Sequence, residues 1–172
     1  LGVKPWLVKE VLEPLLPHLK DKLLFSLAAG IPGEQLREWV ADAAPKGVYT
    51  VIPNLAIEIG ESMTFAHEII GTEATRKCLL DLFNAVGKTQ LVNEKQLGAG
   101  MMVASCGTAF ALRYARASME GGVQLGLYPA QALEAVLQTI KGAADLVDAE
   151  RIDEYMEMDR SAPAYRMDEN AG

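Results

Sequence analysis

Two kinds of apolar spacing alternate along the first half of the chain. Between residues 5 and 19 apolar side chains recur every three or four positions with charged residues between them, which predicts a helix. Pro5 suits the first turn of this helix, whereas Pro14 and Pro17 should kink or end it. Residues 23–27 instead form a nearly continuous apolar run closed by glycine and proline, as expected of a strand buried on both faces.

The same two patterns continue as far as residue 92. A second short apolar run predicts a strand at 48–52, further strands are expected at 62–66 and 88–92, and helical spacing predicts helices at 35–40 and 72–85. The residues expected on the inward face of the second helix are Leu79, Leu80, Leu82 and Phe83. This alternation of strands and helices predicts an α/β layer with a largely parallel sheet.

The predicted strand ends are the natural place to look for a ligand site, because parallel sheets bind ligands at the carboxyl ends of their strands. Three exits carry small residues or proline, which let a ligand approach the backbone closely. Turns after strands use glycine and proline in any case, so ordinary turn chemistry stays open as the explanation of each exit. The exit residues are Val3, Lys4 and Pro5; Ala28, Ala29 and Gly30; and Pro53 and Asn54.

From residue 94 onward no strand pattern remains. Apolar stripes with helical spacing predict one helix over 97–119 and a second, strongly amphipathic helix over 129–147. The stretch 98–111 consists almost entirely of small residues, which weaken a helix but allow close packing. Because a lone pair of helices cannot bury its apolar faces well, we expect a second copy of the chain to cover them.

These patterns predict a nucleotide-binding type of α/β domain over residues 1–94, a helical oligomerisation domain over 95–150 and a disordered acidic tail over 151–172. The formal net charge of -7 argues against nucleic acid or an anionic membrane as a partner. The two cysteines provide neither a disulfide framework nor a zinc site, and they fit a reducing, cytoplasmic compartment. No apolar run reaches the roughly 18 residues of a membrane span.

Sequence motifs for common chemistries are missing from these 172 residues, which contain no GxGxxG after a strand, no GxxxxGK[ST] and no HExxH. His18 and His67 have no partners at metal-ligand spacing, so structural roles are favoured for both. Cys106 is better explained as a packed small thiol than as a nucleophile. The hydroxyls of Ser105 and Thr108 could meet a ligand or bond back to the helix backbone, and both explanations stay open.

Six stretches occur in the order and at the spacings found in one enzyme family. They are LGVKP, LLFSLAAGI, VIPNLAIEIGESMT, LFNAVG, ASCGTAFALRYARASMEGGVQLGL and QTIKGAADL. With them the chain resembles the pyrroline-5-carboxylate reductases over residues 1–147. The resemblance implies the C-terminal part of a Rossmann-like parallel sheet domain plus a helical dimerisation domain. It also implies an oxidoreductase that uses NADPH or NADH to reduce a cyclic imine to L-proline.

The resemblance also assigns site residues. It places the three exits described above against the nucleotide cofactor, and it places the small-residue segment of the helical domain at the imine substrate. The implied substrate residues are Ser105, Cys106, Gly107 and Thr108. No catalytic residue is assigned with certainty and no metal is implied. The implied partner is a second copy of the chain, in a homodimer or higher oligomer through residues 95–150.

The chain departs from the family at several of these positions. Where the family has Ser-Gly-Ser-Gly-Pro-Ala-Tyr, this chain has Ala-Ser-Cys-Gly-Thr-Ala-Phe, so the Cys106 thiol replaces a stronger hydrogen-bonding hydroxyl and Thr108 restores a backbone N–H. Arg113 stands where a threonine near the substrate often occurs; it either pairs with a substrate carboxylate or faces solvent. Leu55 and Ala56 replace the usual Thr-Pro.

Two family motifs do not occur in these residues: the glycine-rich phosphate loop ahead of the VKP motif, and a Ser-Pro-Gly-Gly-type loop after the helices. We therefore expect a fragment or truncated product with weak or no activity, since pyrophosphate recognition relies on the backbone amides of such a loop. Two alternatives stay open. One is a non-catalytic dimerising remnant of the family, and the other is a related NAD(P)-dependent reductase with another substrate.

Overall fold

The computed structural model describes residues 1–148, and the predicted tail over 151–172 lies outside them. Contacts divide the chain into two compact units, a first of Leu1–Ala111 and a second that begins at Leu112. The strands all belong to the first unit, and the division expected at residue 94 stays a prediction. None of the described helices has the length and apolar character needed to cross a membrane.

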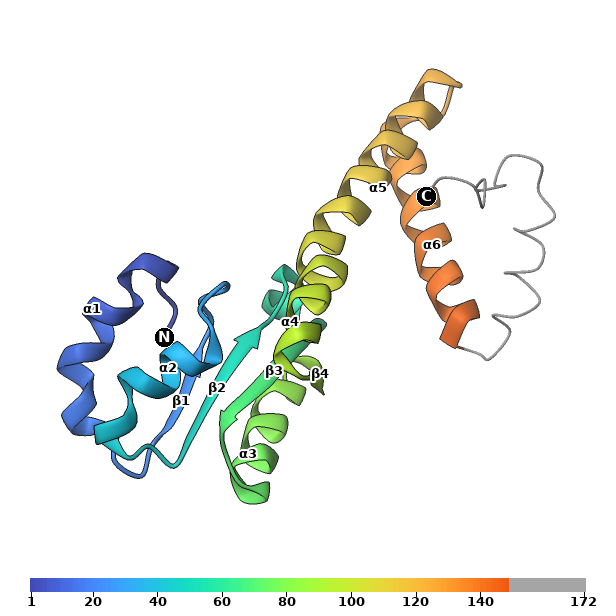
Figure 1. Cartoon of the computed structure of the whole chain (residues 1–172). Helices are drawn as coiled ribbons and strands as arrows, with labels where there is room; N and C mark the ends of the chain where they lie inside the picture. Colours follow the sequence, from blue (N-terminus) through green and yellow to red (C-terminus); the bar gives the residue numbers. More distant parts are fainter. Residues whose placement is uncertain (149–172) are drawn as a thin grey trace, which may run out of the picture. The chain divides into compact units, whose positions relative to one another are not determined.

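A four-stranded sheet forms the centre of the first unit (Figure 1), with its strands in the order β1-β2-β3-β4. The strands are β1 (Leu23–Ser26), β2 (Gly47–Ile52), β3 (Ser62–Ile70) and β4 (Gly87–Leu91). All four overlap the predicted strands, although β3 continues four residues beyond its predicted end.

The sheet is mixed. β1 pairs with β2 in parallel and β3 pairs with β4 in parallel, as expected, whereas β2 and β3 are antiparallel. The reversal follows from the length of the connection, because only nine residues, 53–61, separate β2 from β3. A parallel crossover needs about a dozen residues or more. The sheet therefore consists of two parallel pairs, β1 with β2 and β3 with β4, joined by the antiparallel pairing of β2 with β3.

Short helices surround the sheet. They are η1 (Pro5–Leu7), α1 (Val8–Leu12), η2 (Glu13–His18), α2 (Gly33–Trp39), η3 (Ala41–Ala43), η4 (Leu55–Ile59) and α3 (Glu73–Asn84). The two prolines expected to end the first helix do so, since α1 ends at Leu12 and the chain continues as the 3-10 turns of η2.

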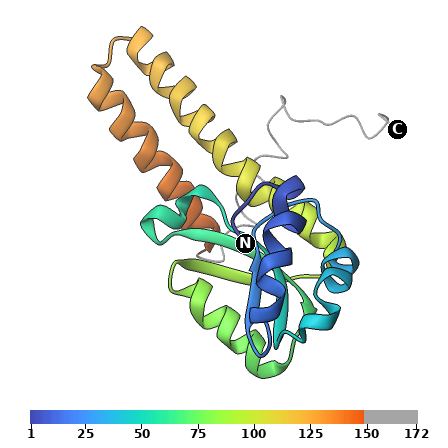
Figure 2. The same ribbon diagram turned by 90° about the vertical axis from the view of Figure 1, so that its left-hand side faces the viewer.

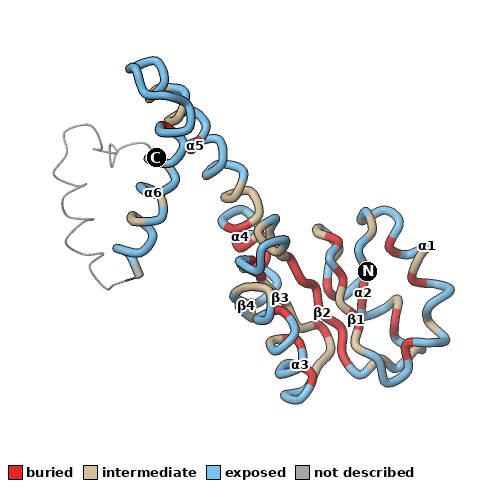
Figure 3. Tube along the Cα trace, turned by 180° about the vertical axis from the view of Figure 1, so that it is seen from behind, coloured by how far each residue is buried: buried red, intermediate tan, exposed pale blue. Residues whose placement is uncertain are grey.

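Helices cover both faces of the sheet, which makes the first unit a three-layer structure (Figure 2). On one face, α1 and α2 pack over Leu24, Val48 and Ile69 of the strands. On the other face, Leu79 and Phe83 of α3 pack against a second cluster of strand residues. The central strand β2 is buried at all six positions (Figure 3), as its continuous apolar run predicts.

The inward face of α3 is narrower than expected. Thr75, Leu79 and Phe83 are buried and Leu80 is half-buried, but Leu82 is 53% exposed. The prediction for Leu82 was therefore wrong. The buried residues are spaced by four along the helix and lie on one stripe, whereas Leu82 lies at the edge of that stripe and faces solvent.

A long helical stretch follows β4. It consists of α4 (Glu94–Gly100), the π-helical segment η5 (Met101–Cys106) and α5 (Gly107–Gln124). α4 begins with a capping box between Asn93 and Gln96 and packs on β3, where Gly100 lies directly against the ring of Phe65. The small residues in this stretch therefore allow a close approach of helix to sheet.

The second unit contains the rest of α5 and the amphipathic helix α6 (Pro129–Asp148). Ala115 and Ala132 are buried, and Gly122 lies close to Ala132, but most of both helices is exposed (Figure 3). The large apolar residues that remain exposed include Leu112, Tyr114, Leu133, Leu137 and Val147. As expected from the sequence, the two helices leave wide apolar faces exposed within residues 1–148.

Candidate functional site

The carboxyl ends of β1 and β2 lie at one edge of the sheet, because the two strands are parallel. Leu1 lies beside β1 at the same edge: Leu27 N donates to Leu1 O at 2.9 Å, and Leu1 N donates to Phe25 O at 2.6 Å. Leu1 therefore donates to the residue before Ser26 and accepts from the residue after it, which is the hydrogen-bond pattern of parallel strands. The structure thus brings all three predicted exits, including that of Val3, Lys4 and Pro5, to one edge.

The β1 exit offers open backbone. Ala28 is buried, Ala29 is half-buried and Gly30 is exposed. Gly30 has a φ of +82°, which side chains other than glycine adopt only with strain, and no atom lies within 4 Å of the point where a Cβ would stand. Glycine is therefore needed here for the turn, and the space beside it is free for a ligand.

The β2 exit is a turn that β3 holds in place. The Asn54 side chain accepts a hydrogen bond from Ala56 N at 3.2 Å, and Asn54 N donates to the Ser62 hydroxyl at 3.3 Å. Ser62 in turn lies 3.0 Å from the Thr64 hydroxyl in a buried pair. The short connection that reverses β3 thus also supplies the groups that fix the predicted Pro53–Asn54 turn.

A cavity of about 280 Å³ opens between the β1 exit and α4. Ala29 and Gly30, both predicted to contact a cofactor, line one side. Thr50 and Ile52 on β2 line it as well, and Leu97 and Gly98 on α4 and Met101 at the start of η5 face them. Ligand pockets for drug-sized molecules run from roughly 300 to 1,000 Å³, so this cavity suits one ring-sized group and not a whole dinucleotide.

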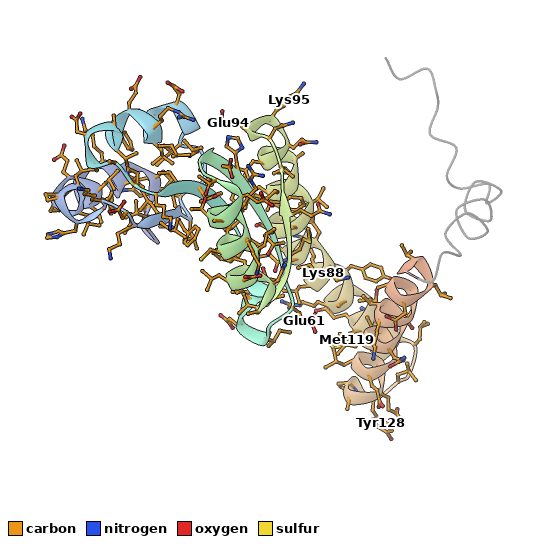
Figure 4. All side chains as sticks on the ribbon, turned by 90° about the horizontal axis from the view of Figure 1, so that it is seen from below. Glu61, Lys88, Glu94, Lys95, Met119 and Tyr128 are labelled. Atoms are coloured by element: carbon orange, nitrogen blue, oxygen red, sulfur yellow. The ribbon has the colours of Figure 1, made fainter. Side chains whose placement is uncertain are left out.

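The cavity also has a polar end that sequence reasoning missed. Glu94, in the first turn of α4 and close to α2 (Figure 4), accepts a hydrogen bond from Gly33 N at 2.6 Å. His67 on β3 has its Nδ1 3.1 Å from Val92 O, and its Nε2 lies on the side of Gly33. Both side chains line the cavity. A structural role was favoured for His67 and nothing in the sequence pointed to Glu94, because only the packing of α4 beside α2 brings the two side chains together.

The small-residue segment reaches the β2 exit through one side chain. The Ser105 hydroxyl donates to Pro53 O at 3.2 Å, which joins a predicted substrate residue to a predicted cofactor residue. The Thr108 hydroxyl donates within its own helix, to Ala104 O at 2.8 Å. Cys106 and Gly107 are half-buried between them. Arg113 is exposed and belongs to the second unit.

The described residues show no metal centre, because residues 1–148 bring together no group of three or more His, Cys, Asp or Glu side chains suited to hold an ion. The site is instead an open backbone edge beside a largely apolar cavity with two polar residues at one end. A helical face follows that is unburied in the single chain. This combination defines a ligand-binding α/β region of the dinucleotide-binding class joined to an association module.

Comparison with known proteins identifies the family. Residues 94–163 match the family model described as pyrroline-5-carboxylate reductase dimerisation. The pyrroline-5-carboxylate reductase of Glycine max is 34% identical over 151 residues, which cover 86% of this chain and 53% of that protein. The Arabidopsis thaliana protein of the same name is 35% identical over 150 residues, covering 85% and 52%. The chain thus spans about half the length of these curated relatives.

Solved structures agree with the sequence relatives. The chain is similar to Plasmodium falciparum pyrroline carboxylate reductase with NADP bound, with a TM-score of 0.79 and 28% identity over 86% of this chain and 59% of that one. It is also similar to the Streptococcus pyogenes 1-pyrroline-5-carboxylate reductase, with a TM-score of 0.70 and 26% identity over 92% and 66%. The chain belongs to the pyrroline-5-carboxylate reductase family, and the resemblance and fold class expected from the sequence are confirmed.

Proposed function

We propose that the chain is part of an NAD(P)H-dependent pyrroline-5-carboxylate reductase, which transfers a hydride to the imine carbon of the cyclic substrate and gives L-proline. The observation that carries this proposal is the edge where three strand exits meet. There the small-residue helix segment joins the β2 exit through Ser105 and Pro53, next to a cavity that suits one ring. Family membership and a structural relative with NADP bound support the same assignment.

The cofactor residues fit a nucleotide at the level of the backbone. Gly30 leaves open space beside a turn, and the Pro53–Asn54 turn is fixed by hydrogen bonds before any ligand arrives. The complete set that would contact NADPH or NADH is Val3, Lys4, Pro5, Ala28, Ala29, Gly30, Pro53 and Asn54. When bound, the dihydronicotinamide supplies the hydride. The chain's own contribution is to hold the ring at the strand ends.

The substrate residues in this proposal are those of the small-residue segment, Ser105, Cys106, Gly107 and Thr108. Protonation of the imine nitrogen makes the neighbouring carbon electron-poor, so hydride transfer mainly requires correct placement of two rings. A segment with small side chains allows a flat ring to approach the helix backbone. The departures at Cys106, Thr108 and Arg113 favour a second candidate, a reductase of the same class with a different cyclic imine, which a substrate panel would distinguish.

Self-association is part of the proposal. The apolar faces of α5 and α6 are exposed in the single chain, and the matching family model describes a dimerisation domain. We infer that a second copy covers these faces through residues 95–150, as a homodimer or a higher oligomer. Burial of apolar area drives such association.

Titration with NADPH and NADH, followed by cofactor fluorescence, tests the proposal. These 172 residues contain no glycine-rich phosphate loop, so we expect them alone to bind NAD(P)H weakly and to turn over the imine slowly or not at all. Weak saturable binding supports the reductase assignment. If no saturable binding is found, the non-catalytic dimerising remnant becomes the favoured function. Rapid NADPH oxidation with the imine would refute the expected loss of activity.

A pair of glycine variants shows whether binding occurs at the proposed edge. Gly30→Ala strains a turn at φ +82° beside the cavity, and Gly126→Ala strains a turn at φ +107° in the second unit, with open space around both positions. We expect only Gly30→Ala to weaken NADPH binding. Equal loss in both variants would show that the effect reports stability and not the site.

A further inference from the structure

We propose that Ser105 is a positioning residue, whose hydroxyl holds the Pro53 carbonyl and so fixes the cofactor turn against the helix segment at the imine. The inference rests on the proposed function, since it explains how the two halves of that site are kept together. Ser105 O γ lies 3.2 Å from Pro53 O, and the two residues are 52 positions apart in the sequence. The bond therefore joins two elements that are far apart in the sequence.

The direction of this hydroxyl is unusual for a helix. Serine and threonine side chains in helices commonly bond back to the carbonyl four residues earlier, as Thr108 does with Ala104 O at 2.8 Å. Ser105, only three residues before Thr108, bonds instead across to the end of β2. It stands in the π-helical segment η5 (Met101–Cys106), and such segments are frequent at functional sites.

The bond completes the support of the β2 exit. On the β3 side, Asn54 N donates to the Ser62 hydroxyl at 3.3 Å. On the helix side, Ser105 supplies the bond to Pro53 O. A proline has no N–H, so its carbonyl is the only backbone group through which Pro53 can be held. Without Ser105 the turn keeps its bonds through Asn54 but loses the bond at Pro53, and it gains freedom that a bound cofactor would have to remove.

The hydroxyl proton also has a consequence for ligands. A serine hydroxyl has one proton and two acceptor positions. Because the proton goes to Pro53 O, the oxygen can only accept a hydrogen bond from anything else. Ser105 thus positions the turn and cannot act as a proton donor to the substrate while this bond is in place.

The test compares Ser105→Ala, which removes the bond, with Ser105→Thr, which keeps a hydroxyl. The matched control is Thr139→Val, since Thr139 loses a comparable hydroxyl bond, to Ala135 O at 2.8 Å, on exposed α6. The first readout is exchange of the Asn54 backbone amide by NMR. One net hydrogen bond corresponds to roughly a threefold to tenfold effect, so we expect exchange to be faster by about that factor in Ser105→Ala alone.

The second readout is the NADPH dissociation constant, which we expect to rise by a similar factor in Ser105→Ala and to recover in Ser105→Thr. Unchanged amide exchange in Ser105→Ala, or no recovery in Ser105→Thr, would overturn the inference. Faster exchange with unaltered NADPH affinity would also overturn it, because the bond would then be structural only. If the unaltered chain binds no NADPH, the proposed function fails, while amide exchange still decides whether Ser105 holds the turn.

Discussion

Two glycines of α4, placed two residues apart, should respond to the same substitution with opposite signs. A Cβ added at Gly98 would have no atom within 4 Å, whereas a Cβ added at Gly100 would stand 2.5 Å from Cγ of Phe65. Gly100 has φ -57° and ψ -41°, which any residue adopts in a helix. Its need for glycine therefore comes from the close approach to β3 and not from backbone conformation.

The magnitudes follow from this geometry. Replacing glycine by alanine inside a helix stabilises it by about 0.5–1 kcal/mol, because alanine loses less chain entropy on folding. Gly98→Ala should show most of this gain. Gly100→Ala should lose it again, since forcing a methyl group into a packed contact costs about 1–3 kcal/mol. We therefore expect the two variants to differ in unfolding free energy by about 1–3 kcal/mol.

Urea unfolding followed by tryptophan fluorescence measures the difference. Both tryptophans, Trp6 and Trp39, lie in the first unit, and Trp39 packs against its core. Gly98→Ala should raise the transition midpoint and Gly100→Ala should lower it, with equal slopes in both. Equal stabilisation by the two substitutions would mean that α4 does not lie on Phe65, and the described packing of α4 on β3 would then be wrong.

Two further predictions concern the core and the association surface. Tyr49 is fully buried, its hydroxyl lies 2.7 Å from Thr75 O γ1, and desolvation by burial raises its pKa. Because the pKa is raised in the folded state, the contribution of Tyr49 to the free energy of unfolding is full below the ordinary tyrosine pKa of about 10 and is lost as the pH rises above it. Tyr49→Phe should cost about 1 kcal/mol at pH 7 and lessen this alkaline loss of stability in urea titrations. An unchanged alkaline loss in the variant would refute the assignment to Tyr49. Leu137→Asp, on the exposed apolar face of α6, should raise the dissociation constant of the proposed dimer at least about tenfold in light scattering, because it would bury an unpaired charge. Gln138→Asp adds the same charge at the neighbouring position on the polar side as a control, and equal effects of both would argue against this face as the interface.

Much of the fold was predictable because burial leaves a simple trace in the sequence. The continuous apolar run of β2 predicted a strand buried on both faces, and the strand is buried at every position. Pro14 and Pro17 predicted the end of the first helix, since proline cannot continue an α-helical hydrogen-bond pattern. The antiparallel direction of β3 was implied only by the short connection before it. The alternation of strands and helices, on which the parallel sheet was predicted, does not take the length of a connection into account.

The site was predictable only in part. Strand exits can be located in a sequence because they follow apolar runs, and the structure brings the predicted exits to one edge. Glu94 and His67 could not be found in this way, because their meeting at the cavity depends on how α4 packs beside α2. The π-helical segment was equally hidden. The helix predicted over 97–119 continues through it, and nothing in the apolar spacing marks residues 101–106.

The antiparallel pairing of β2 with β3 has a consequence for how the site edge assembles. Nine residues, 53–61, close the loop between these strands, whereas 20 residues, 27–46, separate β1 from β2. Loop-closure entropy grows with the logarithm of length, so the hairpin costs about 0.7 kcal/mol less to close than the crossover. The Pro53–Asn54 turn thus belongs to the most local tertiary pairing in the sheet, and the Ser105 bond adds a contact from a distant part of the sequence to a turn that closes early.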